Sequence, residues 1–588
     1  MHSFAVWAPD AARVDVDVLL HGERRTMPMT AGADGWWRRD VEEAGHGTDY
    51  AFRVDGGDPL PDPRSPWQPH DVHAASRVFD AGRFAWTDHG WEGRDVRGAV
   101  LYELHVGTFT AEGTLDAAVD RLDHLVTLGV DVVELMPVAA FPGRWGWGYD
   151  GVALYAVHEP YGGPEALQRF VDACHARGLG VCLDVVYNHL GPSGNYLSRF
   201  GPYFTDHHHT PWGQAVNLDD AGSEHVRRWI VDNALRWFRD FHVDALRLDA
   251  VHALVDDSPE HVLAQLARET AELSASLGRP LGLVAESDLN DPRMVEPTAS
   301  GGLGMTAQWA DDVHHAVHAA LSGERQGYYC DFGSLEALAK VLTRVFLHDG
   351  SYSTFRGRPW GAPVDPQHHS GHAFVAYTCN HDQVGNRAIG DRPSQYLSPG
   401  LQAAAAALVL TSPFTPMLFM GEEWGASTPW QFFTDHAEPE LAQSIREGRR
   451  REFAAHGWRS QDVPDPQDHA TRDASVLRWD EVASDGHATV LDWYRTLIAL
   501  RRREPTLASG DLAGLSVEHS EEERWVVVSR GDLRVALNLG AQPRALPLDV
   551  PAGELLAAWD RDVAIRDGCV LLPGESVAVL RGVASPSR

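Results

Sequence analysis

The sequence has little lysine, few cysteines and no long uninterrupted apolar run. Among its 50 basic residues, Lys340 is the single lysine. Its 5 cysteines are odd in number and scattered, with no CxxC pair, so the sequence predicts neither a disulfide framework nor a zinc ribbon. The most apolar stretch, residues 403–420, is interrupted by Ser412, Pro413 and Pro416. We therefore expect no membrane-spanning helix and no contact with a membrane.

Positive charge is also scarce. The chain carries 50 basic and 83 acidic side chains, a formal net charge of −33. Nucleic-acid binding needs clustered Lys and Arg to contact phosphates, so nucleic acid is excluded as a partner. The first residues show no basic segment followed by an apolar core, so no signal peptide is visible and a cytoplasmic protein is expected. We expect no cofactor and no metal ion.

The length of 588 residues predicts more than one domain. Residues 1–90 contain short strands separated by Gly, Pro and Asp turns, which predicts a small antiparallel β-sandwich. Residues 505–588 return to short strands and predict a second sandwich, so residues 91–504 are left as the catalytic domain. The strands expected in the two sandwiches are residues 4–8, 13–20, 36–41 and 50–54, then 525–529, 533–539, 571–572 and 577–580.

In the central domain, apolar runs alternate with helical segments, the pattern of βα units and a parallel sheet. Eight runs predict an α/β fold, a closed (β/α)₈ TIM barrel, with a helical segment at 490–503 near its end. Residues at the C-terminal ends of such strands carry the chemistry, whereas the strand bodies fill the core. The eight runs are residues 100–108, 130–138, 180–189, 244–252, 281–287, 307–314, 374–382 and 415–422.

The fourth and fifth runs end in acidic residues that we expect to differ in ionisation state. Side chains alternate along a strand, so Arg247 and Asp249 point the same way, into the barrel mouth. A neighbouring cation keeps a carboxylate ionised, as a nucleophile requires, although an internal ion pair would also explain the two residues. Glu286 finishes an apolar strand, where burial raises the pKa of a carboxyl group and holds it protonated.

One ionised Asp beside one protonated Glu is the pair that a retaining glycosidase needs, with carboxyl groups about 5–5.5 Å apart. The seventh run adds Asp382 at the same face of the barrel, and the third adds Asp184, Asn188 and His189. Any one of these could be structural. Four acid-tipped strands at one mouth favour a catalytic site that holds sugar hydroxyl groups.

Four segments carry a family resemblance: DVVYNH (184–189), RLDA (247–250), AES (285–287) and NHD (380–382). They resemble, in order, the four signature regions of the α-amylase superfamily of glycoside hydrolases. The resemblance implies that Asp249 is the nucleophile, Glu286 the general acid/base and Asp382 the transition-state stabiliser. It further implies that Arg247 orients the nucleophile. The residues that it implies for the sugar beside the scissile bond are His189, His381 and, as a stacking platform, Tyr149.

A narrower resemblance covers nearly the whole chain. YELHVGTF (102–109), ESDLND (286–291), QWADDVHH (308–315) and NHDQVGNR (380–387) resemble the malto-oligosyltrehalose trehalohydrolase family. It implies hydrolysis of the α-1,4 bond that joins trehalose to a malto-oligosaccharide, as a step that follows a malto-oligosyltrehalose synthase. The further substrate-binding residues that we expect are Trp309, Asp311, Asp312, His314, His252, Gln383 and Asn386.

Two other functions remain open at this point. A glycogen branching or debranching enzyme would act on α-1,6 branches, and a non-catalytic protein would only bind α-glucan. The ESDLND and WADDVHH stretches favour the trehalohydrolase, and the three carboxylates argue against a purely binding role. A tract of three histidines, 207–209, resembles a metal-binding sequence, but without a set of further ligands it predicts a solvated loop.

Overall fold

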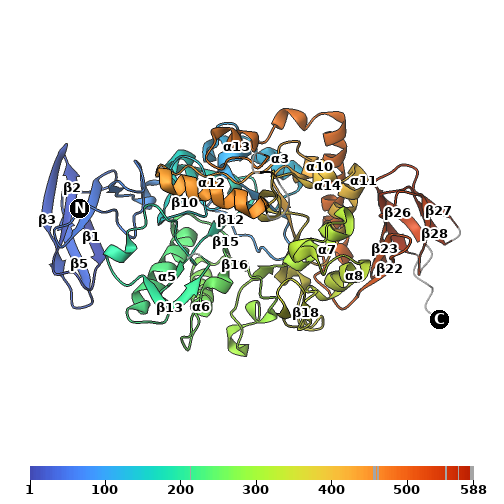
Figure 1. Cartoon of the computed structure of the whole chain (residues 1–588), viewed down its shortest axis with the longest axis horizontal. Helices are drawn as coiled ribbons and strands as arrows, with labels where there is room; N and C mark the ends of the chain where they lie inside the picture. Colours follow the sequence, from blue (N-terminus) through green and yellow to red (C-terminus); the bar gives the residue numbers. More distant parts are fainter. Residues whose placement is uncertain (212, 455–458, 460–461, 550–551, 567, 583–588) are drawn as a thin grey trace.

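The computed structural model describes residues 1–588 except 212, 455–458, 460–461, 550–551, 567 and 583–588. The molecule is elongated, with one β-sandwich at each end of a central barrel (Figure 1). Among the described residues, no helix is both long enough and apolar enough to span a membrane.

The predicted (β/α)₈ barrel is confirmed. Eight parallel strands close on themselves, and each pairs with the strands that precede and follow it in the barrel series. Every run expected from the sequence contains one of these strands, and the strand bodies are buried. The barrel strands are β8 (Leu101–Leu104), β9 (Val132–Leu135), β12 (Gly180–Val185), β15 (Ala245–Leu248), β16 (Gly282–Ala285), β17 (Ala307–Trp309), β20 (Phe374–Tyr377) and β21 (Thr415–Phe419).

Helices follow most of these strands and cover the barrel, although only short 3-10 turns lie between β16 and β17. Their buried faces repeat at helical spacing, as in α8, where Leu335, Leu338, Val341 and Leu342 are buried. The expected helix at 490–503 is the second part of α14. The main helices are α3 (Leu122–Leu128), α4 (Gly163–His175), α5 (Ser223–Asp240), α6 (Val262–Leu277), α7 (Asp311–Ser322), α8 (Leu335–Arg344), α11 (Pro399–Leu410) and α14 (Asp485–Arg503).

The N-terminal sandwich consists of two antiparallel sheets, β1-β5-β4 and β3-β2-β6-β7. All four strands expected there are present, and β3 lies on the edge of its sheet with exposed side chains, which explains why no apolar alternation marks it. The strands are β1 (His2–Trp7), β2 (Val14–Leu20), β3 (Glu23–Pro28), β4 (Thr30–Ala31), β5 (Trp36–Val41), β6 (Asp49–Val54) and β7 (Ser76–Arg77).

The C-terminal sandwich also has two sheets, β22-β23-β24-β29-β26 and β25-β28-β27. Its core is a separate apolar cluster between these sheets. The strands are β22 (Leu515–Ser520), β23 (Trp525–Arg530), β24 (Leu533–Asn538), β25 (Arg544–Pro547), β26 (Ala552–Ala558), β27 (Ala564–Arg566), β28 (Cys569–Leu572) and β29 (Ser576–Gly582).

Two insertions extend the loops at the C-terminal face of the barrel. A hairpin of β13 (Phe204–Thr210) and β14 (Gly213–Val216) follows β12, and helix α12 (Pro439–Ala454) follows β21. Figure 1 shows α12 lying across the middle of the molecule. Helix α12 supplies part of the wall of the barrel mouth, the face at which this fold places its chemistry, whereas no residue of the β13–β14 hairpin lines the cavity there.

Candidate active site

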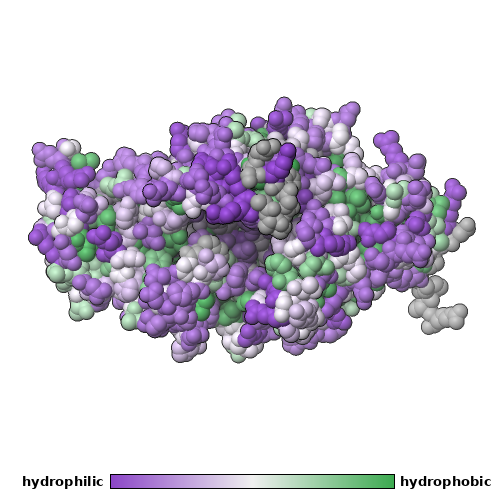
Figure 2. All heavy atoms as spheres, viewed as in Figure 1, coloured by the Kyte–Doolittle hydropathy of each residue, from purple (hydrophilic) through white to green (hydrophobic). Residues whose placement is uncertain are grey.

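A cavity of about 610 Å³ lies at the C-terminal ends of the barrel strands. Figure 2 shows a hollow in the middle of the molecule whose rim is largely hydrophilic. Acidic, histidine and aromatic side chains share the lining, a combination that suits sugar rings with their apolar faces and hydroxyl edges. The lining residues are Trp147, Tyr149, Asp150, His189, Leu190, Pro192, Asp249, Ala250, His252, Glu286, His381, Asp382, Phe432, Thr434, Leu441 and Ile445.

One buried guanidinium organises the acidic groups below this cavity. Arg247 lies on β15 and is fully buried, with its guanidinium carbon 4.2 Å from the centre of the Trp309 ring. Its Nη1 donates to Asp249 Oδ1 at 2.9 Å and to Asp184 Oδ2 at 2.7 Å. Its Nη2 lies 2.9 Å from Glu286 Oε2. A single cation therefore holds three carboxylates together, and the two predicted catalytic groups lie on the same guanidinium.

Asp249 follows directly after β15, and its side chain is largely buried. Its Oδ2 accepts a hydrogen bond from Asn188 Nδ2 at 2.9 Å. Burial alone would raise the pKa of Asp249, but Arg247 and the Asn188 amide outweigh burial and hold that pKa below its usual value. Asp249 is therefore ionised near neutral pH, as a nucleophile must be.

Glu286 follows directly after β16 and, unlike Asp249, is held in its protonated form. Its Oε2 accepts a 2.7 Å hydrogen bond from the backbone N–H of Ala250, a residue in the left-handed region with φ of 40°. Burial raises the pKa of Glu286 well above its usual value; Arg247 opposes the shift, and the charges of Asp249 and Asp382 add to it. Glu286 is thus the protonated partner of an ionised Asp249.

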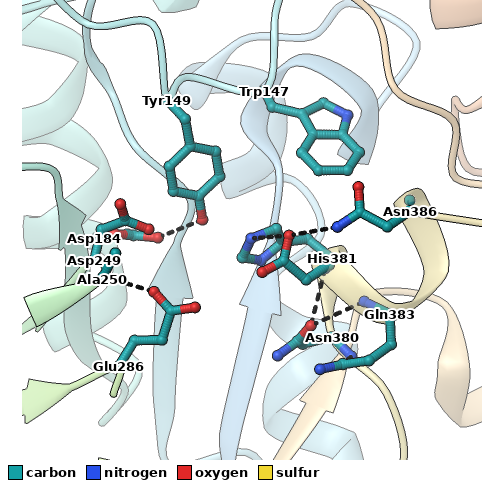
Figure 3. A network of polar contacts seen from close by, with 12 residues as sticks. Trp147, Tyr149, Asp184, Asp249, Ala250, Glu286, Asn380, His381, Gln383 and Asn386 are labelled. Carbon is teal, nitrogen blue, oxygen red and sulfur yellow. Dashed lines mark hydrogen bonds and ion pairs between the residues drawn. The ribbon is translucent and has the colours of Figure 1, made fainter. Parts of the chain in front are cut away.

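Tyr149 and Asp184 form the floor beside this pair (Figure 3). The Tyr149 hydroxyl donates to Asp184 Oδ2 at 2.7 Å, and burial raises the pKa of Asp184 to about 6. His189 Nδ1 lies 2.5 Å from Asn188 Oδ1, and its Nε2 lies 3.0 Å from the Tyr149 carbonyl oxygen. Asn188 consequently links His189 to Asp249.

The other side of the cavity is formed by the short helix α9 (His381–Gly385). Asn380 caps its N-terminus, and the Gln383 side chain returns a hydrogen bond to the Asn380 backbone, so Gln383 completes a capping box. Asp382 lies in the first turn, and its Oδ1 accepts a 3.2 Å hydrogen bond from Asn386 Nδ2. Figure 3 shows this helix across from Glu286, and both His381 and Asp382 line the cavity together with Asp249 and Glu286.

Seven of the fourteen sequence-predicted site residues line this cavity, whereas the residues of the WADDVHH stretch lie outside its lining. Trp309 is buried under Arg247. His314 is also buried, between the Thr378 carbonyl oxygen and the Tyr329 hydroxyl. Asp311 is half-buried; it accepts a hydrogen bond from the Tyr377 hydroxyl, and burial raises its pKa.

Asp312, the neighbour of Asp311, faces away from the cavity. It is 5% exposed, and its Oδ2 accepts hydrogen bonds from Asn290 Nδ2 at 3.0 Å and from the backbone N–H groups of Leu347 and His348 at 2.7 and 3.3 Å. His252, by contrast, lines the cavity, 3.8 Å from Asp288. None of the four WADDVHH residues is among those that line the cavity, and Trp309, Asp312 and His314 are buried. Contact with the sugar stays a prediction only for Asp311, which is half-buried.

Sequence reasoning missed two parts of the site. Glu103 on β8 contacts His381, although its place in an apolar strand is the same signal that identified Glu286. Helix α12 supplies Leu441 and Ile445 to the cavity wall, and Arg449 from this helix donates to the Gly385 carbonyl oxygen at 2.5 Å. No sequence motif places an inserted helix over a barrel mouth.

The histidine tract lies on β13, away from the cavity lining. His208 Nε2 lies 2.9 Å from Asp219 Oδ2, which also accepts a hydrogen bond from the backbone N–H of Asp257. His208, Asp219 and Asp257 offer ligand atoms within 4.8 Å of one another. The view of the tract as a solvated loop is thus incomplete at His208, which has acidic neighbours that the sequence did not reveal. Because hydrogen bonds inside the cluster account for its geometry, we assign no metal ion to it.

Three segments of the chain match known protein families. Residues 81–206 match the catalytic domain of α-amylase, and residues 2–68 match carbohydrate-binding module 48, the isoamylase N-terminal domain. Residues 510–579 match a domain of unknown function, DUF3459. The carbohydrate-binding module match falls on the N-terminal sandwich, the α-amylase match on the first part of the barrel region, and the DUF3459 match on the C-terminal sandwich.

Full-length relatives are named malto-oligosyltrehalose trehalohydrolase. One from Mycobacterium tuberculosis is 55% identical over 588 residues, 99% of either chain. One from Arthrobacter ramosus is 56% identical over 98% of this chain and 99% of its own. By contrast, a 1,4-α-glucan branching enzyme from Vibrio parahaemolyticus is 33% identical over only 52% of this chain and 46% of its own.

Solved structures share the fold. A crystal structure of a presumed α-amylase from Salmonella typhimurium superposes with a TM-score of 0.90 at 39% identity, over 98% of this chain and 97% of that one. A pullulanase from Paenibacillus barengoltzii, in complex with maltohexaose and α-cyclodextrin, superposes with a TM-score of 0.71 at 20% identity, over 99% of this chain and 93% of that one. The pullulanase likeness shows the fold alone.

Proposed function

Because this chain belongs to the malto-oligosyltrehalose trehalohydrolases, a family with an α-amylase catalytic domain, we propose that it hydrolyses the α-1,4 bond next to the trehalose end of malto-oligosyltrehalose. The products are trehalose and a malto-oligosaccharide. The full-length relatives favour this activity over glycogen branching or debranching, since the branching enzyme matches only about half of the chain.

The observation that carries the mechanism is the contact of one guanidinium with an ionised Asp249 and a protonated Glu286. In the first step Asp249 Oδ attacks C1 of the glucose at the scissile bond, while Glu286 donates its proton to the departing oxygen of trehalose. In the second step Glu286, now ionised, takes a proton from water, whose oxygen attacks C1 and releases Asp249. Retention of the α configuration follows from the two displacements.

The remaining residues supply binding and charge stabilisation. Tyr149 offers a ring face to the sugar, and His189 and His381 border its hydroxyl groups. Asp382, opposite the reacting pair, stabilises positive charge that develops at C1. Arg247 keeps the nucleophile ionised and correctly aimed throughout.

The proposal also implies a cellular location for the enzyme and a preceding reaction that supplies its substrate. All five cysteines lie in the described part of the chain and are free, which suits the reducing cytoplasm. The substrate must come from a reaction that converts the reducing end of a malto-oligosaccharide into trehalose, the work of a malto-oligosyltrehalose synthase. Nothing in the mechanism requires a stable complex with that enzyme.

Product analysis tests the function. Incubation with malto-oligosyltrehalose should release trehalose and a malto-oligosaccharide whose new reducing end is first seen by NMR as the α-anomer. Asp249→Asn should keep the fold and lose at least about three orders of magnitude in kcat, because no covalent intermediate can form. A β-anomer as first product, or cleavage of branched glucan in preference to malto-oligosyltrehalose, would contradict the proposal.

A further inference from the structure

A buried glutamate that the sequence motifs did not identify as a site residue contacts His381 of the cavity. Glu103 comes from β8 and is 1% exposed. Both of its carboxylate oxygens bind one residue: Oε1 lies 2.5 Å from His381 Nδ1, and Oε2 accepts the His381 backbone N–H at 3.0 Å. This two-point contact fixes both the start of α9 and the orientation of the His381 ring.

The remaining surroundings of His381 leave one ring nitrogen for the substrate. Its ring stacks on Tyr149, with centroids 5.0 Å apart and planes at 25°, and meets Trp147 edge-on. Its carbonyl oxygen accepts the indole N–H of Trp430 at 3.0 Å. Nε2 lies 3.7 Å from Asp382 Oδ1, and His381 lines the cavity. Because Nδ1 is held by Glu103, Nε2 is the atom that can meet a sugar hydroxyl group.

The charges around His381 favour its protonated form. Burial would lower the pKa of His381, but the carboxylates of Glu103 and Asp382 outweigh burial and raise it to about 9, against the opposing charge of Arg247. Glu134 lies on β9, directly beside Glu103 of β8. Burial raises the pKa of Glu134 to about 8, so this carboxyl group is neutral near pH 7. The charged or titratable groups that face His381 from the surrounding elements are Glu103, His105, Asp184, Arg247, Asp249 and Asp382.

We propose that Glu103 is a positioning residue that keeps His381 as an imidazolium, so that Nε2–H is a permanent donor toward the sugar and Asp382. The role deepens the proposed function and rests on it for its catalytic meaning. A neutral histidine with its proton on Nδ1 would present a lone pair at Nε2, and it would repel the carboxylate of Asp382. Glu103 therefore acts through His381 on the charge balance opposite Asp249.

Glu103→Gln tests this role through the pH profile of kcat/KM. The variant keeps a hydrogen-bond acceptor but loses the charge, so the pKa of His381 should fall toward the ordinary value of about 6.5. At about pH 5.5 the histidine is protonated in both proteins, and kcat/KM should differ less than about fivefold. At about pH 8 the variant should lose roughly ten- to a hundred-fold, through a new limb that the wild type lacks.

Glu134→Gln is the matched control. Glu134 lies next to Glu103 in the barrel, is equally buried, and neither of its oxygens has a hydrogen-bond partner. Because it is neutral up to about pH 7, its amide variant should reproduce the wild-type profile up to that pH, without a new limb near pH 6.5. A uniform loss in Glu103→Gln at all pH values, together with a lower Tm, would indicate a merely structural role and overturn the proposal.

NMR of the wild type gives a second readout that does not depend on folding of the variant or on catalysis. A far-downfield imidazole N–H resonance, identified by its absence from His381→Asn, should persist almost without titrating up to about pH 8. A resonance that titrates near pH 6.5 would overturn the proposal even if the enzyme is active. If the wild type released no trehalose, the proposed function would fail, while this measurement would still decide the state of His381.

Discussion

Asp311 and Asp312, neighbours at the start of α7, have different surroundings despite identical chemistry. Asp311 is half-buried beside Tyr377 and Gln383, and the charges of Asp382 and Asp288 contribute to its raised pKa. Asp312 is buried against backbone N–H groups of the segment after α8. The two residues therefore allow substrate selection to be separated from structural support.

We expect Asp311→Ala to lower kcat/KM for malto-oligosyltrehalose about ten- to a hundred-fold more than for a plain malto-oligosaccharide, as loss of one charged hydrogen bond predicts. Asp312→Ala is the control: it should lower Tm by several degrees and affect both substrates equally, because it leaves buried N–H groups unpaired. Steady-state kinetics on the two substrates, with thermal unfolding, measures both effects. Equal losses on both substrates for Asp311→Ala would defeat its role in specificity.

At the level of elements, one side chain of α12 ties this helix to α9 beside the cavity. The Arg449 guanidinium is 11% exposed; it donates to the Gly385 carbonyl oxygen and lies 5.3 Å from the Phe432 ring centre. It thereby ties α12 to the end of α9, the helix that carries Asp382. Leu441 and Ile445, on the same helix, form cavity wall.

Arg449→Met should release this tie and raise KM about tenfold, with a smaller effect on kcat, because loss of one charged hydrogen bond costs about 1.5–3 kcal/mol. Arg451→Met is a matched control on the same helix, since Arg451 is 73% exposed and its nearest acid, Glu447, lies 3.9 Å away. Its kinetics should stay within about twofold of wild type. Unchanged KM in Arg449→Met would show that the contact of Arg449 with Gly385 does not position α12.

The elements also show which parts of the structure could be predicted from sequence. The eight barrel strands were predictable because buried parallel strands are continuous apolar runs, and the acidic tips of β15 and β16 were visible in the sequence for the same reason. Strand β3 was not predicted, because an exposed edge strand has no apolar face. The contact of Asp311 with Tyr377 and that of Asp312 with the segment after α8 depend on the start of α7, which follows β17 after a single residue, Ala310. Strand periodicity does not extend across such a boundary.

At the scale of the whole molecule, the C-terminal sandwich is joined to the barrel through a buried cation. Arg530 on β23 is 3% exposed and donates to the carbonyl oxygens of Thr411 at 2.5 Å and Ser509 at 2.6 Å. Arg501 on α14 binds the carbonyl oxygens of Ser412 and Phe414 nearby, each at 2.7 Å. These bonds satisfy the end of α11 and the turn into β21 from outside the barrel.

Arg530→Met should leave the carbonyl groups of Thr411 and Ser509 without their arginine donor, at a cost of about 1–3 kcal/mol. It should also lower the temperature at which the C-terminal sandwich unfolds. Calorimetry should then show an earlier transition, separate from that of the barrel. Arg566→Met, at an exposed position on β27, serves as the control and should leave the trace unchanged. A single transition at the wild-type temperature in Arg530→Met would show that the Arg530 contacts do not hold the two domains together.

The contact of Arg247 with Asp184, Asp249 and Glu286 has a consequence for how such a site can evolve. A substitution at any of the four residues alters the ionisation of the other three, so their mutational effects are not additive. A lineage that drifts at one position loses activity before a second change can compensate. We therefore expect the four residues to be retained together in active enzymes, and substitutions that change specificity to be tolerated more readily in the surrounding loops.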